Sequence, residues 1–435
     1  MKYIAQIQAV IELLAEIEAT GAPADNVASQ FFRYRRYIGA GDRRVISALA
    51  FKVLRHQGKL NWWASYMGLS DVQKPRRQTM LGLIFLEGVP PKELDEIFSS
   101  EEYGPTALTS LEMYALEKFK VRSLDHKEMP EHIRLDLPEW AYLRLKAVFG
   151  EDLDAEVEAL NQQAPLDLRI NTLKVTKDHV LHKFNKLGWD VEETKLSPLG
   201  LRMNRGKPLT NSEMFKNGSV EVQDEGSQIV SLLCDAQPGQ AVLDMCAGAG
   251  GKTLVLASTM QNKGRLLATD VHEHRLTKAK LRLRKAGVNN HEIKVLDENA
   301  NQWFRRQTGR FDRVLIDVPC SGSGTWRRNP DLKNRFNEND LNELVEKQRE
   351  IMENAYPLLK SGGVLVYATC SLYREENEDQ IENFLRKHPE FEILPVPEVW
   401  ERCVGGSCPV TTDMLRLSPF KNHTDGFFTA LLKKK

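Results

Sequence analysis

Strand-like and helix-like segments alternate from about residue 216 to the end of the chain. Apolar runs typical of strands occupy residues 241–246, 265–271, 292–297, 312–318 and 362–370. Amphipathic segments separate them, and the longest of these, 341–363, ends at Gly362 and Gly363. Alternation of this kind gives a parallel sheet with helices on both faces. We therefore predict a doubly wound, Rossmann-like α/β domain over 216–435, with 427–435 as its last strand.

The chain before residue 216 follows two other patterns. Residues 1–135 carry apolar positions at helical spacing and lack strand-like runs, which predicts an all-helical domain. Residues 136–215 combine strand-like segments with a helix closed by Gly188, which predicts a small α/β module. Arg169 and Asn171 beside the first of these strands are candidate contacts for a phosphate or a ribose.

Charge and cysteine content limit the cellular compartment and the partners that we expect for this protein. The 60 Lys and Arg balance the 60 Asp and Glu, so any basic surface must be local. No segment has the pattern of a secretory signal or the length of a membrane span. The six cysteines lack the density of a disulfide scaffold, and Cys403 and Cys408 have no second pair nearby to complete a metal site. We expect a cytoplasmic protein with free thiols, no metal and no membrane partner.

One basic stretch lies inside the helical segment. Residues 31–44 interleave aromatic rings with five arginines, which are Arg33, Arg35, Arg36, Arg43 and Arg44. Arginines neutralise phosphates and aromatic rings stack on bases, so the stretch suits an RNA surface. A solvated helix face packed by its own aromatic rings is the alternative, and the sequence leaves both open.

A glycine-rich loop, DMCAGAGGKT, follows the first strand of the C-terminal domain. It is not a Walker loop, because Cys246 stands where that loop needs its first glycine. It also lacks the dinucleotide fingerprint, since Thr253 replaces the third glycine. What remains is a tight turn that lets a ligand lie against backbone amides at a helix N-terminus.

Acidic residues close four successive strands, namely Asp244, Asp270, Asp297 and Asp317. The carboxyl ends of parallel strands share one sheet edge, where doubly wound folds bind ligands. The position of Asp270 after the glycine loop suits a ribose with free hydroxyls, and Asp297 is placed to accept from an adenine amino group. S-adenosylmethionine, a nucleoside without phosphate, fits this ordered set.

Two cysteines, Cys320 and Cys370, follow strand ends at the same edge. Cysteine is more often a buried hydrophobe than a reactive group, which is what we expect of Cys234 and Cys246. A pair at a ligand-binding edge permits more specific chemistry. Carbon 5 of cytosine becomes nucleophilic when a thiolate adds to carbon 6, and a second group must then help remove the carbon 5 proton. One thiol for addition and one for release account for the pair, and Asp317 is placed to hydrogen-bond the ring nitrogen.

The motifs DMCAGAGGKT, DVPCSGSGT, ATCSLYREENEDQ and HTDGFFTALL resemble, in this order, those of the RsmB/NOP2/Sun family of RNA cytosine-5 methyltransferases. QDEGSQIVSLL and LRINTLK extend the resemblance upstream. The resemblance implies a class I methyltransferase fold, S-adenosyl-L-methionine as cofactor and an RRM-like RNA-binding module over 136–215. The helical segment resembles, more loosely, the NusB-like domain of the RsmB branch, whose substrate is a cytosine in 16S ribosomal RNA.

The resemblance also implies roles for single residues. Cys370 is then the nucleophile, and Cys320 assists release. The cofactor is held by the glycine loop and three acids, which are Cys246, Ala247, Gly248, Ala249, Gly250, Gly251, Lys252, Asp270, Asp297 and Asp317. Two positions depart from the family: Ala249 replaces the common proline and keeps the turn small, and Val318 replaces the usual alanine and tightens the loop near the base.

Other protein classes were weighed against this prediction. A DNA cytosine-5 methyltransferase would attack with Cys320, but it follows that cysteine with glutamine where this chain has Ser321. An RNA-binding or ribosome-assembly factor with an inactive domain would lack a thiol or Asp317, and an N- or O-methyltransferase would need neither cysteine. We predict a monomer that methylates carbon 5 of a cytosine in RNA, with small-subunit ribosomal RNA as the expected substrate and tRNA or an RNA-binding, ribosome-assembly role as the alternatives.

Overall fold

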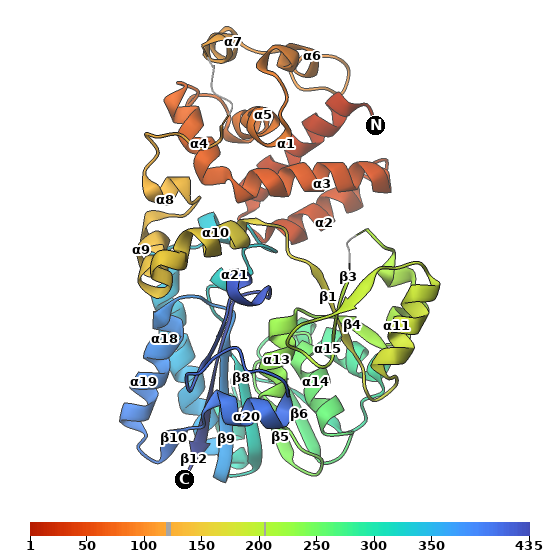
Figure 1. Cartoon of the computed structure of the whole chain (residues 1–435), viewed down its shortest axis with the longest axis vertical. Helices are drawn as coiled ribbons and strands as arrows, with labels where there is room; N and C mark the ends of the chain where they lie inside the picture. Colours follow the sequence, from red (N-terminus) through yellow and green to blue (C-terminus); the bar gives the residue numbers. More distant parts are fainter. Residues whose placement is uncertain (119–122, 204–205) are drawn as a thin grey trace. The chain divides into compact units, whose positions relative to one another are not determined.

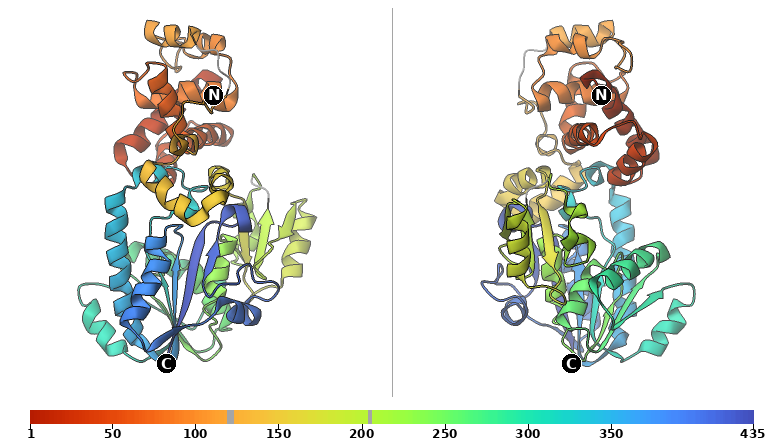
Figure 2. Two further views of the ribbon diagram at one scale, coloured as in Figure 1. Left: turned by 60° about the vertical axis from the view of Figure 1, so that its left-hand side comes forward. Right: turned by 90° about the vertical axis from the view of Figure 1, so that its right-hand side faces the viewer.

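The computed structural model describes residues 1–118, 123–203 and 206–435, and the chain forms two compact units (Figures 1 and 2). The first unit contains Met1–Gln162 together with Trp326–Asn337. The second contains Gln163–Thr325 and Glu338–Lys435. The domain boundaries expected at residues 135 and 215 stay predictions.

The described residues of the first unit form helices joined by loops, without a strand. Its longer helices are α1 (Tyr3–Thr20), α2 (Ala24–Tyr34), α3 (Ala40–Arg55), α4 (Gln57–Tyr66), α5 (Lys74–Glu87), α7 (Ser110–Glu117), α9 (Glu139–Phe149) and α10 (Leu153–Asn161). Its short helices are α6 (Leu94–Ile97), α8 (Glu131–Arg134) and α17 (Leu332–Arg335). Helix α1 buries one apolar stripe, including Ile7, Leu14 and Ile17, against α2, α3 and α5, as expected for an amphipathic core helix. The prediction of a helical N-terminal region is confirmed.

A short segment of the chain after Cys320, residues 326–337, packs within this helical unit. Its Lys333 is buried and donates hydrogen bonds to the Arg55 carbonyl at 2.8 Å and to Asn161 Oδ1 at 2.6 Å. Arg55 in turn donates to the carbonyl of Arg327 at 2.9 Å. The segment therefore forms part of the helical unit, although its contact residues Arg55 and Asn161 are far from it in the sequence.

The second unit begins with a small antiparallel sheet in the order β2-β3-β1-β4. Its strands are β1 (Leu166–Ile170), β2 (Val191–Glu193), β3 (Gly200–Met203) and β4 (Val220–Val222). Helix α11 (Lys177–Lys186) covers it through Val180 and Phe184, and α12 (Glu213–Lys216) leads into β4. The segment has the mixed α/β character that the sequence predicts.

The larger sheet has the order β10-β12-β9-β8-β5-β6-β7, with β11 paired to β12. The parallel strands are β5 (Ala241–Asp244), β6 (Arg265–Asp270), β7 (His291–Val295), β8 (Phe311–Asp317) and β9 (Leu359–Thr369). The antiparallel strands are β10 (Phe391–Ile393), β11 (Leu415–Leu417) and β12 (Phe427–Lys434). Strand β12 contains the predicted last strand, and it pairs with β9.

Helices cover both faces of this sheet (Figure 1). One face packs on α13 (Glu225–Leu232), α14 (Gly251–Thr259), α15 (Glu273–Ala286) and α20 (Val396–Cys403). The other packs on α16 (Ala300–Gln307), α18 (Glu338–Ala355) and α19 (Glu378–Lys387). The short helix α21 (Pro419–Asn422) comes between β11 and β12 in the sequence. Alternate strand residues serve the two cores, as Val242 and Leu243 do on β5. The Rossmann-like doubly wound fold is confirmed.

One predicted boundary is wrong. Helix α18 was expected to continue to Gly362 but ends at Ala355, where a short 3-10 turn (Tyr356–Leu358) begins. Pro357 lacks an amide hydrogen and disfavours helical backbone at the residue before it, so it ends the helix earlier than the glycines. Gly362 lies instead within β9. Among the described residues, no helix combines the length and apolar character needed to cross a bilayer.

Candidate active site

A cavity of about 530 Å³ opens at the carboxyl ends of the parallel strands in the second unit. Residues from the glycine loop, from the ends of β5, β6, β8 and β9, and from α15 and α18 line it. The predicted site residues among them are Cys246, Ala247, Gly248, Ala249, Gly251, Lys252, Asp270, Asp317, Cys320 and Cys370. The fold thus brings most of the predicted set to one place.

The glycine loop turns the end of β5 into α14. Gly250 has φ of +79° and forms the N-cap, and a Cβ there would lie 2.9 Å from that of Ala279. Both the backbone angle and this close approach to α15 require glycine. Gly250 shapes the turn without lining the cavity, whereas its neighbours Gly248 and Gly251 do line it.

Asp270 is fixed at the end of β6 by two backbone amides. Gly248 N donates to its Oδ2 at 2.9 Å, and His272 N donates to its Oδ1 at 2.8 Å. The carboxylate therefore joins the glycine loop to the start of α15 while facing the cavity. A carboxylate held this way is preorganised to accept hydrogen bonds from a ligand.

Asp244 lies at the end of β5 and is fully buried. Thr253 Oγ1 donates to its Oδ2 at 2.6 Å, whereas its Oδ1 is buried without a hydrogen-bond partner. Burial and the nearby charge of Asp317 raise the pKa of Asp244 to about 7. A cation in the cavity would favour its ionised form.

Lys252 and Asp317 form an ion pair at the cavity wall, with 2.5 Å between Nζ and Oδ2. Lys252 lies in the first turn of α14, and Asp317 ends β8. Burial alone would lower the pKa of Lys252, but the charge and hydrogen bond of Asp317 outweigh it and raise that pKa. Lys252 is therefore a cation, and its partner is the carboxylate that the sequence analysis assigned to the ring nitrogen.

The two thiols lie side by side in the cavity, with 3.4 Å between Cys320 Sγ and Cys370 Sγ. Parallel pairing of β8 with β9 sets Asp317 beside Ala368, so the loops after the two strands leave the sheet together. Gly324 N also donates to the Cys370 carbonyl at 2.9 Å. The hydrogen bond with Cys370 and burial raise the pKa of the Cys320 thiol well above its ordinary value. Either sulfur can donate the hydrogen in this contact.

Several predicted contacts lie away from the cavity. Leu296 lines it, but Asp297 instead accepts from Asn299 N at 3.0 Å and keeps a side chain 49% exposed. Its assignment to the adenine stays a prediction. Arg169 and Asn171 are buried, so neither reaches a phosphate or ribose at the surface, and that prediction is wrong. Asn171 holds the carbonyls of Gly218 and Ala286 at 2.8 and 2.9 Å.

Sequence reasoning did not identify the polar lining residues Gln223, Ser227, His272, Arg275, Arg282 and Lys347. Gln223 and Ser227 lie in the QDEGSQ motif, which was recognised without a role for either. Arg282 donates to the Ala249 carbonyl at 2.7 Å and so supports the glycine loop from α15. Nothing in the charged helical sequences distinguishes Arg282 or Lys347 from their solvent-facing neighbours.

The arginine and aromatic stretch of the first unit divides into two sets. Arg35 bonds Glu16 at 2.9 Å and lies over the Phe31 ring, and Arg43 donates to the Ile38 carbonyl at 2.8 Å. The outward set consists of Arg33, Tyr34, Arg36, Tyr37 and Arg44, with Tyr34 81% exposed and Tyr37 73% exposed. The inward set packs as the solvated-helix alternative expects, and an RNA surface on the outward set stays a prediction.

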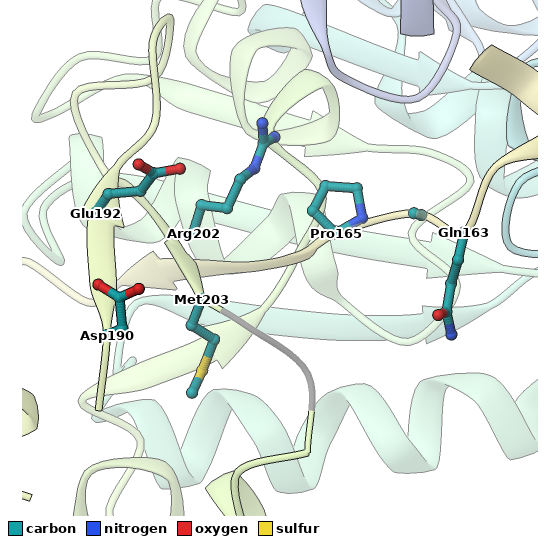
Figure 3. Close-up of a pocket in the computed structure, with 7 residues that line it drawn as sticks. Gln163, Pro165, Asp190, Glu192, Arg202 and Met203 are labelled. Carbon is teal, nitrogen blue, oxygen red and sulfur yellow. The ribbon is translucent and has the colours of Figure 1, made fainter. Parts of the chain in front are cut away.

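A second cavity, of about 470 Å³, lies on the small sheet (Figure 3). Its polar lining includes Asp190, Glu192 and Arg202. The Arg202 guanidinium donates to both carboxylate oxygens of Asp167, at 2.7 and 2.9 Å. The lining, as far as the described residues form it, contains no thiol and no glycine loop. The cavity at the strand ends is therefore the candidate active site.

Comparisons with known proteins show which family the chain resembles. The family model described as 16S rRNA methyltransferase RsmB/F matches residues 231–433, and the RsmF/B-like ferredoxin-like domain matches residues 137–210. A probable ribosomal RNA small subunit methyltransferase B from Synechocystis is 32% identical over 415 residues, covering 90% of this chain and 91% of the relative. Ribosomal RNA small subunit methyltransferase B from Photorhabdus laumondii is 29% identical, covering 91% of each chain. The crystal structure of PH0851 aligns with a TM-score of 0.78 at 27% identity, covering 100% of this chain and 99% of that one.

Proposed function

This chain belongs to the RsmB/F family of 16S rRNA methyltransferases, and from that membership we propose that it methylates carbon 5 of a cytosine in small-subunit ribosomal RNA. The observation that carries the choice of carbon 5 is the pair of thiols 3.4 Å apart at the cavity. Methylation of an exocyclic nitrogen or a hydroxyl needs no thiol, whereas carbon 5 needs one to activate the ring and gains from a second.

The proposed cofactor is S-adenosyl-L-methionine, which when bound supplies an electrophilic methyl group on a sulfonium centre. Two lining oxygens, Asp244 Oδ1 and Gln223 Oε1, are buried without partners and can accept from ammonium or hydroxyl groups. Asp270 presents a carboxylate fixed by two amides, which suits a ribose. The cavity wall also carries the cations Arg275 and Lys347 for a carboxylate. These residues fit the cofactor.

In the proposed reaction, Cys370 adds as a thiolate to carbon 6 of the cytosine. The S–C6 bond forms, and the electrons of the C5–C6 double bond become available at carbon 5. Asp317, which lines the cavity and is oriented by Lys252, accepts a hydrogen bond from the ring nitrogen once that nitrogen is protonated, and so stabilises the adduct. The neighbouring Cys320 thiol stabilises the Cys370 thiolate by donating to it before attack.

Release reverses the addition after the methyl group is in place. Cys320 first loses its thiol proton to water, and the resulting thiolate takes the carbon 5 proton while the C5–H electrons restore the C5–C6 double bond. The C6–S bond then breaks, and its electrons return to Cys370 as a thiolate. The 3.4 Å separation lets both sulfurs reach adjacent carbons of one ring.

Bisulfite sequencing of RNA from cells with and without the gene tests the proposal. We expect one cytosine of 16S rRNA to lose its protection from deamination when the gene is deleted, and to regain it on complementation. Complementation by Cys408→Ala, at a thiol that does not line the cavity, is the matched control. Unchanged protection throughout 16S rRNA would refute the substrate, and a lost signal only in tRNA would reassign it.

A further inference from the structure

A buried glutamate lies behind the two thiols. Glu376 ends the short 3-10 turn Arg374–Glu376, on the segment that follows Cys370, and its side chain is completely buried. The proposed reaction assigns it no role. Its environment nevertheless connects it to both thiol-bearing loops.

The carboxylate of Glu376 holds the residue next to Cys320. Its Oε1 accepts from the backbone amide of Ser321 at 2.8 Å, and its Oε2 accepts from Ser321 Oγ at 2.5 Å. Gln348 Nε2 donates to Oε1 at 2.9 Å and to the Pro319 carbonyl at 3.0 Å. The residues on both sides of Cys320 are therefore tied, directly or through Gln348, to one carboxylate.

The same network reaches the loop of the second thiol. Ser371, which directly follows Cys370, has its Oγ 3.1 Å from Ser321 Oγ. Ser371 is also fixed through its carbonyl, which accepts from Asn377 Nδ2 at 2.9 Å. The Glu376 carbonyl itself accepts from Tyr367 Oη on β9 at 2.6 Å. The loop that carries Cys320 and the loop that carries Cys370 are therefore connected by hydrogen bonds that include Glu376.

The chemistry of the position calls for two acceptor oxygens. An ionised carboxylate only accepts hydrogen bonds, and a buried one is stable only where donors surround it. An amide in its place would keep one oxygen for the Ser321 and Gln348 N–H groups, and its NH₂ would donate to Ser321 Oγ, which can also accept. An alanine would remove the acceptor of the Ser321 amide, and it would leave Ser321 Oγ and Gln348 Nε2 with their contacts to Ser371 Oγ and the Pro319 carbonyl.

We propose that Glu376 is a positioning residue that holds the Cys320 thiol against Cys370 for the release step. The inference rests on the proposed carbon 5 chemistry. Loss of the carboxylate frees the Pro319–Ser321 loop, whereas Cys370 keeps its own anchors in Asn377 and in β9. Release is therefore impaired more than attack.

Single-turnover reactions of Glu376→Ala and Glu376→Gln with 16S rRNA and cofactor test the proposal. The measured quantity is the ratio of protein–RNA complex that survives denaturant to methylated RNA. We expect Glu376→Ala to raise this ratio several-fold and Glu376→Gln to retain the wild-type value. A ratio unchanged in Glu376→Ala, with both species lowered together, would reduce Glu376 to a structural role.

A second measurement needs no RNA. Oxidation by diamide joins thiols that are held close, and peptide mass spectrometry identifies the Cys320–Cys370 disulfide. We expect Glu376→Ala to form it several-fold more slowly than the wild type and Glu376→Gln to match the wild type. Equal rates in all three proteins overturn the positioning role, even if the wild type makes no 5-methylcytosine and the proposed function itself fails. Should Glu376→Ala not fold, Ser321→Ala, which removes one donor, carries both tests with shifts in the same direction.

Discussion

The sulfur atoms of Cys320 and Cys370 lie 3.4 Å apart although 50 residues separate them in the chain. That distance exceeds the roughly 2.05 Å of a disulfide bond, so both thiols are free. Their closeness follows from topology, because β8 and β9 are parallel neighbours, Cys370 directly follows β9 and Cys320 is the third residue after β8. The doubly wound sheet thus places two thiols in the lining of one cavity.

Removal of the proposed nucleophile should separate binding from chemistry. We expect Cys370→Ala to lower methyl transfer by more than about 1,000-fold, the order seen when an enzyme loses its nucleophile. Cofactor affinity, measured by calorimetry, should stay within about twofold because the glycine loop and Asp270 are untouched. Cys408→Ala serves as the control, and full activity of Cys370→Ala would reject the assignment.

Asp244 gives a pH dependence of stability with a definite sign. Its pKa is about 7 in the folded protein and near its ordinary value of 3.8 when unfolded, so between these values the folded state holds an extra proton. Its stabilising contribution is complete below pH 4 and is lost as pH rises through 7. Asp244→Asn cannot titrate, so its free energy of unfolding should fall less steeply over this window, by up to about 1.4 kcal/mol per pH unit.

Urea unfolding from pH 4.5 to 7.5 measures the difference between the two profiles. Asp178→Asn, at an exposed carboxylate of α11, is the control and should run parallel to the wild type. Parallel profiles for Asp244→Asn as well would mean that its pKa is not raised.

The outward arginines of the first unit should govern part of the RNA affinity. We expect Arg33→Gln and Arg36→Gln each to weaken binding of 16S rRNA and to reduce the slope of log K against log salt by about one unit or less. Lys92→Gln, an exposed cation elsewhere in the same unit, is the matched control. An unchanged slope in both arginine variants would leave the stretch as a solvated helix face.

Lys333 should stabilise the helical unit although it belongs to the chain after Cys320. Lys333→Ala leaves the Arg55 carbonyl and Asn161 Oδ1 without their buried donor, and we expect a loss of about 2–4 kcal/mol in unfolding free energy. Hydrogen exchange should localise the loss to α3 and α10. Lys127→Ala, at an exposed lysine of the same unit, should cause no loss, and equal protection in both variants would contradict the packing.

The sequence predicted the sheet and much of its edge because both depend on short-range pattern. Strand ends marked by Asp244, Asp270 and Asp317 follow directly from alternation of strands and helices. Asp297 was grouped with them, but β7 ends at Val295. Asp297 therefore falls in the following turn, where its carboxylate accepts from the Asn299 amide. Two residues of extra chain are enough to turn a side chain from the cavity.

Short-range sequence pattern could not identify residues that act through tertiary contacts. Glu375 and Glu376 are adjacent in an acidic run, yet Glu376 is fully buried against Ser321 and Glu375 is not. Lys333 likewise looks like one cation in a polar loop, whereas burial lowers its pKa to about 8. Only the packing of distant segments distinguishes such residues from their solvent-facing neighbours.

The division of labour between the two sulfurs is tested most directly with Cys320→Ala. Incubation with 16S rRNA and cofactor, followed by a denaturing gel, measures covalent protein–RNA complex. We predict that Cys320→Ala accumulates the complex, that Cys370→Ala does not, and that Cys320→Ala combined with Cys370→Ala does not. A complex that persists in the double variant, or none in Cys320→Ala, would contradict the account.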